Sequence, residues 1–190
     1  TILSSSKYAL TTLKAGIIIG SGGASFEIIR DLVEKLPIMI APRWLKTKCQ
    51  PIAIRNVIQF LIGVMGKTET YNNSYDIGGP DILTYKEMLL SYAKVRGLKR
   101  KILIVPVMTP KLSSYWLLFI TSTTYELAKN LVDSMKVEVI CKPNNLASRL
   151  NIPLIDYKTS ITLAFDKIEQ NHVFYSWEEI QNNTTLIEKF

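Results

Sequence analysis

The first clear pattern along the chain is an apolar run, a glycine-rich turn and a helical stretch. Residues 11–19, TTLKAGIII, form a β-rich apolar run that predicts one buried strand. From Phe26 to Leu36, apolar side chains recur at helical spacing, and Pro37 fits just beyond the end of such a helix. We expect Ser25 to cap this helix at its N-terminus.

Shorter strands and helices alternate over the rest of the chain. Short strands are predicted at IMI, PIAI and KILIVPV and near Val139, while PRWLKTKCQ is typical of an irregular connector. Residues 55–65 predict a helix whose apolar side carries Val57, Ile58, Leu61 and Val64. Strands that alternate with helices indicate the α/β class.

Local signals mark the later helices and one turn. Gly78-Gly79-Pro80 predicts a turn, and the T-x-x-E sequence from Thr84 to Glu87 is a capping box before a helix that stops near Gly97. Further helices are expected from Thr109-Pro110, over 125–135, over 146–150, and from a cap at Asp156 to about residue 171.

The amino-acid composition limits the classes of protein to which this chain can belong. The chain has 190 residues, of which 47% are hydrophobic and 21% charged, so it can bury a core. The net charge of +7 favours an anionic ligand, but the basic residues are dispersed, and we expect no nucleic-acid partner. Cys49 and Cys141 have no metal-ligand spacing, which favours small core residues in a reduced, cytoplasmic protein. We expect no metal site and no catalytic acid–base pair in this chain.

The glycine turn leaves two interpretations open. Gly20-Ser21-Gly22 gives the first two glycines of the dinucleotide fingerprint G-x-G-x-x-G/A, but Ser25 stands at its third position. The acid that should follow about 20 residues later is absent, although Arg43 could take the 2′-phosphate of NADP. The other interpretation is a tight turn that leads into a helix.

A wider set of motifs supports a resemblance to a known family. Residues 13–20, LKAGIIIG, are similar to LRPGxxxG, and residues 50–57, QPIAIRNV, are similar to hxxVxDV with Asn56 in place of the usual Asp. Residues 75–88, YDIGGPDILTYKEM, closely match YNVGGPExLTYxEL. Together with VPVMTPKLSSYWLLFIT, these blocks resemble the C-terminal part of extended and atypical short-chain dehydrogenase/reductases, which are relatives of nucleoside-diphosphate-sugar epimerases and NmrA-like proteins. The resemblance extends to about residue 171.

The resemblance implies a fold and a division of the chain. It implies the C-terminal part of a Rossmann-like NAD(P)-binding domain plus a small substrate-binding subdomain. Within one fragment-like unit, residues 1–66 would end the Rossmann-like region, 67–171 would form the substrate-side subdomain, and 172–190 would be a tail. The family's fingerprint and Tyr-x-x-x-Lys pair precede these blocks and are not in this sequence, since Tyr8 is followed by Thr12 at the lysine position.

The resemblance also implies a function and a cofactor. We expect the substrate-binding portion of an NAD(P)-dependent epimerase- or dehydratase-like protein acting on a small molecule such as a nucleotide sugar. The alternative is an NmrA-like module that senses NAD(P) without turnover. NAD or NADP would bind the intact protein, and we expect neither to bind this chain tightly by itself.

Candidate site residues follow from the same match. Backbone groups of residues 15–18 (Ala15, Gly16, Ile17 and Ile18) would face the nicotinamide. The substrate-side candidates are Ser25, Phe26, Arg43, Trp44, Gln50 and Tyr115. We also expect self-association, because an apolar strand without its sheet neighbours is adhesive, and we expect no membrane contact, although the apolar YWLLFI stretch left that option open.

Overall fold

The computed structural model describes residues 9–105 and 135–169, along which strands alternate with helices. The strands are β1 (Thr12–Ala15), β2 (Ile18–Ile19), β3 (Ile38–Ala41), β4 (Lys48–Cys49), β5 (Ile52–Ala53), β6 (Ser74–Ile77), β7 (Leu83–Thr84) and β8 (Lys101–Ile104). The α-helices are α1 (Ala24–Lys35), α2 (Ile54–Val64), α3 (Tyr85–Val95), α6 (Leu146–Arg149) and α7 (Tyr157–Glu169), and the 3-10 helices are η2 (Arg43–Lys46) and η3 (Thr68–Thr70). The α/β class is therefore confirmed.

The strands pair two by two. Three pairs are parallel, namely β1 with β6, β2 with β5, and β3 with β8, and β4 pairs with β7 in antiparallel fashion. In the described part of the chain, each strand of β1–β8 thus has a single partner. Parallel pairing requires long crossover connections, and helices supply them here, as expected for an α/β protein.

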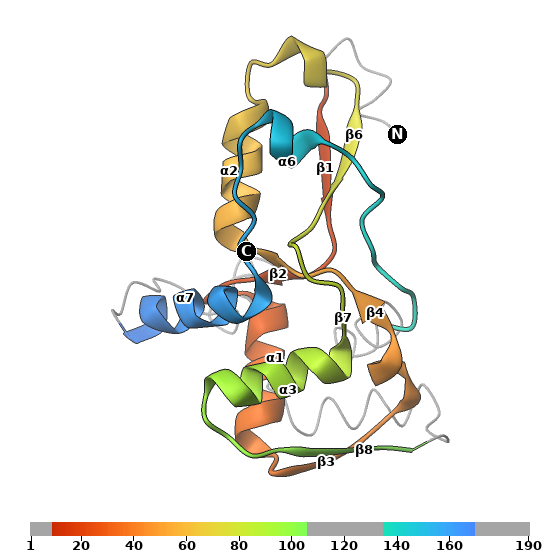
Figure 1. Ribbon diagram of the computed structural model, residues 1–190, viewed down its shortest axis with the longest axis vertical. Coiled ribbons are helices and arrows are strands. Elements are labelled where there is room, and N and C mark those ends of the chain that lie inside the picture. The colour runs from red at the N-terminus through yellow and green to blue at the C-terminus, as the bar shows by residue number, and fades with distance from the viewer. Residues whose placement is uncertain (1–8, 106–134, 170–190) are drawn as a thin grey trace, which may run out of the picture.

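Two hydrophobic clusters lie one above the other along the molecule (Figure 1). The upper cluster joins α2 and α6 to the β1–β6 pair, and Phe60 and Leu146 are buried in it. The lower cluster packs α1 against α3 and α7. In the view of Figure 1, β2 and α7 lie between the two parts.

The predicted single strand over residues 11–19 is two strands, so this prediction was wrong. The chain bends at Gly16, after which β2 pairs with β5 whereas β1 pairs with β6. A Cβ atom at Gly16 would lie 2.6 Å from Cγ1 of Val139, so the bend brings another segment close to the backbone. Apolar composition alone does not reveal such a change of partner.

The capping residue was predicted correctly for α3 and α7 but not for α1. Gly23, not Ser25, is the N-cap of α1, and no side chain caps that helix, so Ser25 lies in the first turn. Thr84 and Glu87 form the predicted capping box at the start of α3. Asp156 accepts hydrogen bonds from the backbone N–H and the hydroxyl of Thr159, at 3.0 and 2.7 Å, as expected for a cap of α7.

The buried side of α2 was predicted only in part, since Val64 is buried and Val57 packs against the upper cluster as expected. Its buried residues are Asn56, Phe60 and Val64, whereas Ile58 and Leu61 are about half exposed. Apolar residues occur on nearly every side of this helix, so periodicity could not select the face that meets the upper cluster.

Gly78 and Gly79 serve close packing and do not form a tight turn. Neither has a positive φ, and the backbone N–H of Gly79 donates to the carbonyl of Pro51 at 2.9 Å. A Cβ atom at Gly79 would collide with that carbonyl, and one at Gly78 would lie 2.6 Å from Sγ of Cys141. The glycines therefore let the chain after β6 pass directly against the loop before β5.

The helices predicted within residues 109–135 lie almost entirely outside the described residues. Tyr115, a predicted substrate-side residue, also lies outside them. The short strand predicted near Val139 is only a single bridge to Cys49, whereas the short helix near 146–150 is confirmed as α6. No helix among the described residues is both long and apolar enough to cross a membrane.

Candidate functional site

A largely apolar cavity of about 150 Å³ lies between α1 and α3. Helix α1 contributes Ser25, Ile28, Ile29 and Leu32 to its wall, and α3 contributes Tyr85, Met88 and Leu89. The remaining wall consists of Gly16, Ile17, Trp44, Leu45, Met135 and Val139.

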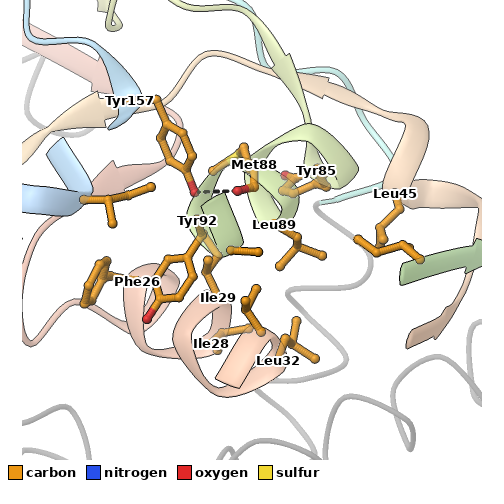
Figure 2. Packing of buried hydrophobic residues seen from close by; sticks show 14 of the residues in the cluster. Phe26, Ile28, Ile29, Leu32, Leu45, Tyr85, Met88, Leu89, Tyr92 and Tyr157 are labelled. Carbon is orange, nitrogen blue, oxygen red and sulfur yellow. Dashed lines mark hydrogen bonds between the residues drawn. The ribbon is translucent and has the colours of Figure 1, made fainter. Parts of the chain in front are cut away.

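The facing apolar sides of the two helices build this site. Figure 2 shows Ile28, Ile29 and Leu32 of α1 opposite Met88 and Leu89 of α3. Tyr157, at the start of α7, holds α3 from the other side, because its hydroxyl donates to the carbonyl of Met88 at 3.3 Å (Figure 2). The helical period of residues 26–36 placed Ile29 and Leu32, but not Ile28, on the apolar face of α1, and the capping box fixed where α3 begins.

Trp44 closes one side of the cavity. It belongs to η2, is 9% exposed, and packs edge to face against Tyr85 with ring centroids 6.0 Å apart. Its indole Nε1 is buried and has no hydrogen-bond partner in the part of the chain that the structure describes. A buried indole N–H usually finds a partner, so this donor is an unusual feature of the wall.

Gly16 and Ile17 line the cavity where β1 gives way to β2. The other two residues predicted to contact the nicotinamide lie elsewhere: Ala15 pairs with Ile77, and Ile18 pairs with Ile52 and is 36% exposed. The carbonyl of Ile17 already accepts a hydrogen bond of 2.8 Å from the N–H of Ile52. The structure thus brings two of these four residues to the cavity.

The residues predicted to bind substrate separate into different groups. Ser25 and Trp44 line the cavity. Phe26 is buried on another side of α1, where its ring packs against Phe165 with centroids 5.5 Å apart, and Arg43 is exposed. Gln50 binds the protein itself, because its amide donates to the carbonyl of Gly79 and accepts from the N–H of Cys141.

Nine residues of the cavity wall were not assigned from the sequence, namely Ile28, Ile29, Leu32, Leu45, Tyr85, Met88, Leu89, Met135 and Val139. The helix over 85–95 was predicted, but a pattern within one segment does not show which distant segment it will face. The pairing of α1 with α3 is a tertiary contact, and no signal in the sequence alone identified it.

Tyr85 on the cavity wall and Cys49, which lies behind Met88, are neutral at physiological pH. Burial raises the pKa of Cys49 to about 12 and raises the pKa of Tyr85 above its usual range. The Cys49 thiol donates to Sδ of Met88 at 3.2 Å, as a packed core residue does. The described residues contain no group of three His, Cys, Asp or Glu side chains that could hold a metal ion.

The glycine turn opens onto a different hollow, of about 390 Å³. Gly20, Ser21, Arg55 and Lys167 are among its lining residues. The N–H of Gly23 donates to the carbonyl of Gly20 at 3.2 Å, and Gly22 has a φ of 76°, which closes a tight turn. A Cβ atom at Gly20 would lie 2.6 Å from Cγ2 of Ile54, so the turn is packed against the start of α2.

The topology around this turn differs from that of a dinucleotide cradle. In the fingerprint unit, the strands before and after the helix belong to the same parallel sheet. Here β2, before α1, pairs with β5, whereas β3, after α1, pairs with β8. This difference favours the interpretation of Gly20–Gly23 as a turn that leads into a helix.

The fold can be compared with known proteins. No protein-family model and no curated protein matches the chain. Solved structures do match, and one is a nucleoside-diphosphate-sugar epimerase from Staphylococcus aureus, with a TM-score of 0.61 and 13% identity over 84% of this chain and 54% of that one. The chain has the fold of such enzymes over about half of their length.

Two further neighbours have the same fold. The triphenylmethane reductase of Citrobacter sp. matches with a TM-score of 0.58 and 14% identity, over 77% of this chain and 51% of that one. UDP-glucuronic acid 4-epimerase from Bacillus cereus, solved with UDP-glucuronic acid and NAD, matches with a TM-score of 0.53 and 12% identity, over 83% of this chain and 44% of that one. The described chain thus has part of a Rossmann-like α/β fold, and these neighbours are two epimerases and a reductase.

Proposed function

We propose that this chain is the C-terminal, substrate-binding portion of an NAD(P)-dependent protein of the epimerase, dehydratase or reductase kind. The observation that carries the proposal is the cavity between α1 and α3, which opens beside the bend at Gly16 within a fold shared with such enzymes. A substrate in this cavity would lie next to the end of β1, as the sequence resemblance implies. The intact protein would be cytoplasmic and would bind NAD or NADP.

The free edge of β1 supports the same proposal. In the described chain β1 pairs with β6 alone, so its other edge can accept a further parallel strand. A preceding Rossmann half would supply that strand, the dinucleotide fingerprint and the Tyr-x-x-x-Lys pair. The catalytic groups would then come from that half, which agrees with a cavity whose described wall has no acid–base pair.

The alternative is a sensor that binds NAD(P) and a small molecule without turnover. The absence of carboxylate, histidine and lysine side chains from the described cavity wall favours this possibility. The reading frame upstream of Thr1 distinguishes the two. A fingerprint followed by Tyr-x-x-x-Lys supports the enzyme, and a fingerprint without that pair supports the sensor.

Cofactor titration tests the proposal directly. We expect calorimetry on the 190-residue chain to show no tight binding of NADP or NAD, because contacts near Gly16 and Ile17 reach only the nicotinamide end and are too few to offset the entropy lost on association. The same chain, produced with its upstream part, should bind one of the two.

A dissociation constant for NADP in the low micromolar range for the isolated chain would contradict this expectation. Arg43→Gln would then show whether the glycine turn is the cradle after all, because loss of the exposed guanidinium should weaken NADP more than NAD. Failure of the longer protein to bind either dinucleotide would contradict the proposed function itself.

A further inference from the structure

The hollow beside the glycine turn is a second place where a small molecule can bind. It lies where β2 and β5 meet the start of α2 and one face of α7 (Figure 1). Its volume of about 390 Å³ falls within the range of small-molecule sites. Among the described residues it shares no lining residue with the cavity between α1 and α3, so its ligand is distinct from the substrate of the proposed function.

Two positive charges border this hollow. Arg55, in the first turn of α2, and Lys167, near the end of α7, both line it, and both are exposed. Neither has an ion-pair partner in the described part of the chain, and no Asp or Glu side chain is among the described lining residues. Two cations without a neighbouring carboxylate create a positive potential, which favours an anionic ligand.

Two neutral donors line the same hollow. Oε1 of Gln59 accepts a hydrogen bond from Nδ2 of Asn56 at 2.8 Å, which leaves Nε2 of Gln59 as a donor. That Nε2 group and the hydroxyl of Ser21 have no partner among the residues that the structure describes. The hollow thus offers donors and positive charge, and an acceptor-rich anion suits it.

The number of donors favours a phosphate over a carboxylate. A phosphate monoester has three terminal oxygens and a charge of about −1.5 to −2 at neutral pH. A carboxylate has two oxygens and a single charge. Two cationic side chains and two neutral donors therefore match the phosphate better.

The rest of the lining indicates that the ligand has an apolar part. Ile54 and Ile58 of α2 line the hollow and are 43% and 48% exposed, and Leu163 of α7 lines it from the other helix. These side chains can lose contact with water only if something apolar covers them. Inorganic phosphate would leave them exposed, whereas a phosphate attached to a ring or a short chain would cover them.

We propose that this hollow binds the phosphate monoester of a small apolar alcohol. Arg55 and Lys167 hold the phosphate, and Ile54, Ile58 and Leu163 contact the apolar body. The proposal goes beyond the proposed function, because it assigns a second ligand to a separate site. The glycine turn then supplies one hydroxyl, that of Ser21, to a small ligand and does not cradle a dinucleotide.

Three probes test the two parts of the ligand. Phenyl phosphate has both parts, inorganic phosphate lacks the ring, and benzoate replaces the phosphate with a carboxylate. We expect phenyl phosphate to bind about tenfold more tightly than inorganic phosphate, because the ring buries apolar surface. It should bind about fivefold more tightly than benzoate, the factor that one exposed ion pair contributes.

Ligand-observed NMR titration at low ionic strength gives the three affinities. Equal affinities of phenyl phosphate and inorganic phosphate would overturn the apolar contact and leave an adventitious ion only. Equal affinities of phenyl phosphate and benzoate would overturn the phosphate assignment. Absence of saturable binding at millimolar concentrations would overturn the site.

Charge-removing variants test the contacts to the phosphate. Arg55→Gln and Lys167→Gln should each weaken the binding of phenyl phosphate about fivefold. Lys94→Gln is the matched control, because Lys94 is also exposed and lacks an ion-pair partner among the described residues but lines a different hollow. All three variants lower the net charge by one. Equal effects of the three would mean that only the net charge matters and would overturn the proposal.

A pair of variants on α2 tests the location. Ile58 lines the hollow and Leu61 does not, although their side chains are 48% and 51% exposed. Ile58→Glu should abolish the binding of phenyl phosphate by charge repulsion, while Leu61→Glu should preserve it. Both variants place a carboxylate on the exposed apolar side of α2, so any effect of self-association is common to them. Equal binding by the two would overturn the location. These measurements involve no dinucleotide, so their outcome is independent of the cofactor titration.

Discussion

At the scale of single residues, Asn56 shows how a buried amide holds a loop without a charge. It is fully buried at the first turn of α2, and its Nδ2 donates to the carbonyl of Pro153 at 2.9 Å and to Oε1 of Gln59 at 2.8 Å. Its Oδ1 accepts from the N–H of Ile155 at 2.8 Å. Both faces of the amide are used, so the segment before α7 is fixed to α2.

We expect Asn56→Asp to destabilise the protein by about 1–3 kcal/mol, because the carbonyl of Pro153 loses its donor and faces a carboxylate. Desolvation and this carbonyl should raise the pKa of the new carboxyl in the folded state. The loss of stability should therefore shrink as the pH falls and grow as the pH rises through the folded pKa. Urea denaturation at several pH values measures this, and a loss independent of pH would contradict the account.

The same residue marks what the sequence could and could not predict. The resemblance implied Asp at this position, where the chain has Asn. The motif located a residue that fixes a loop, but not its partners, because Pro153 and Ile155 are about a hundred residues away in the chain.

At the scale of elements, the start of α3 was predicted because all its signals are local. The hydroxyl of Thr84 accepts from the N–H of Glu87 at 3.2 Å, and the Glu87 carboxylate accepts from the N–H of Thr84 at 2.7 Å. The hydrogen bond from the backbone of Thr84 is the main reason why the pKa of Glu87 lies below its usual range.

Thr84→Ala should therefore cost about 1 kcal/mol of stability. The contribution of the Glu87 carboxylate should be fully present above the ordinary pKa of glutamate and lost as the pH falls through its lowered folded pKa. The stability difference between wild type and Glu87→Gln should thus be larger at neutral pH than in strong acid. Thermal denaturation across this range checks it, and a difference that grows on acidification would contradict the cap.

The prediction of the buried face of α2 was right for Val57 and Val64 and wrong for Ile58 and Leu61, for the opposite reason. Phe60 and Val64 face the upper cluster, whereas Ile58, Leu61 and other apolar residues face outward. Which side of an apolar helix is buried depends on partners from β1, β6 and α6, and these come from three separate parts of the chain. A pattern confined to one helix cannot contain that information.

At the scale of the whole molecule, an exposed apolar surface runs along α2. It consists of Ile54, Ile58, Leu61, Ile62 and Met65, each at least 43% exposed. Contiguous apolar surface of this kind marks a contact site. We therefore expect a further part of the protein or a second copy to bind this surface or the free edge of β1.

We expect the isolated chain to form dimers or larger species through this surface. Leu61→Glu should shift it toward monomer, because a carboxylate in an apolar interface loses hydration. Ile82→Glu is the matched control, since Ile82 and Leu61 are equally exposed at 51%. Sedimentation velocity at micromolar concentrations measures the effect. A clean monomer for the wild-type chain, or equal effects of the two substitutions, would contradict the expectation.

The course of the chain through the two clusters affects how the molecule folds. Residues 13–15, 52–77 and 146–152 contribute to the upper cluster, and residues 17–49, 83–104 and 157–168 contribute to the lower one. Neither cluster can be completed from one continuous stretch, since the final contribution to each comes from beyond residue 145. Many stabilising contacts therefore join residues far apart in sequence, which makes folding slow. A ribosome that has just passed residue 104 has thus produced two unfinished cores, and both remain open to aggregation until residues 146–168 have been made.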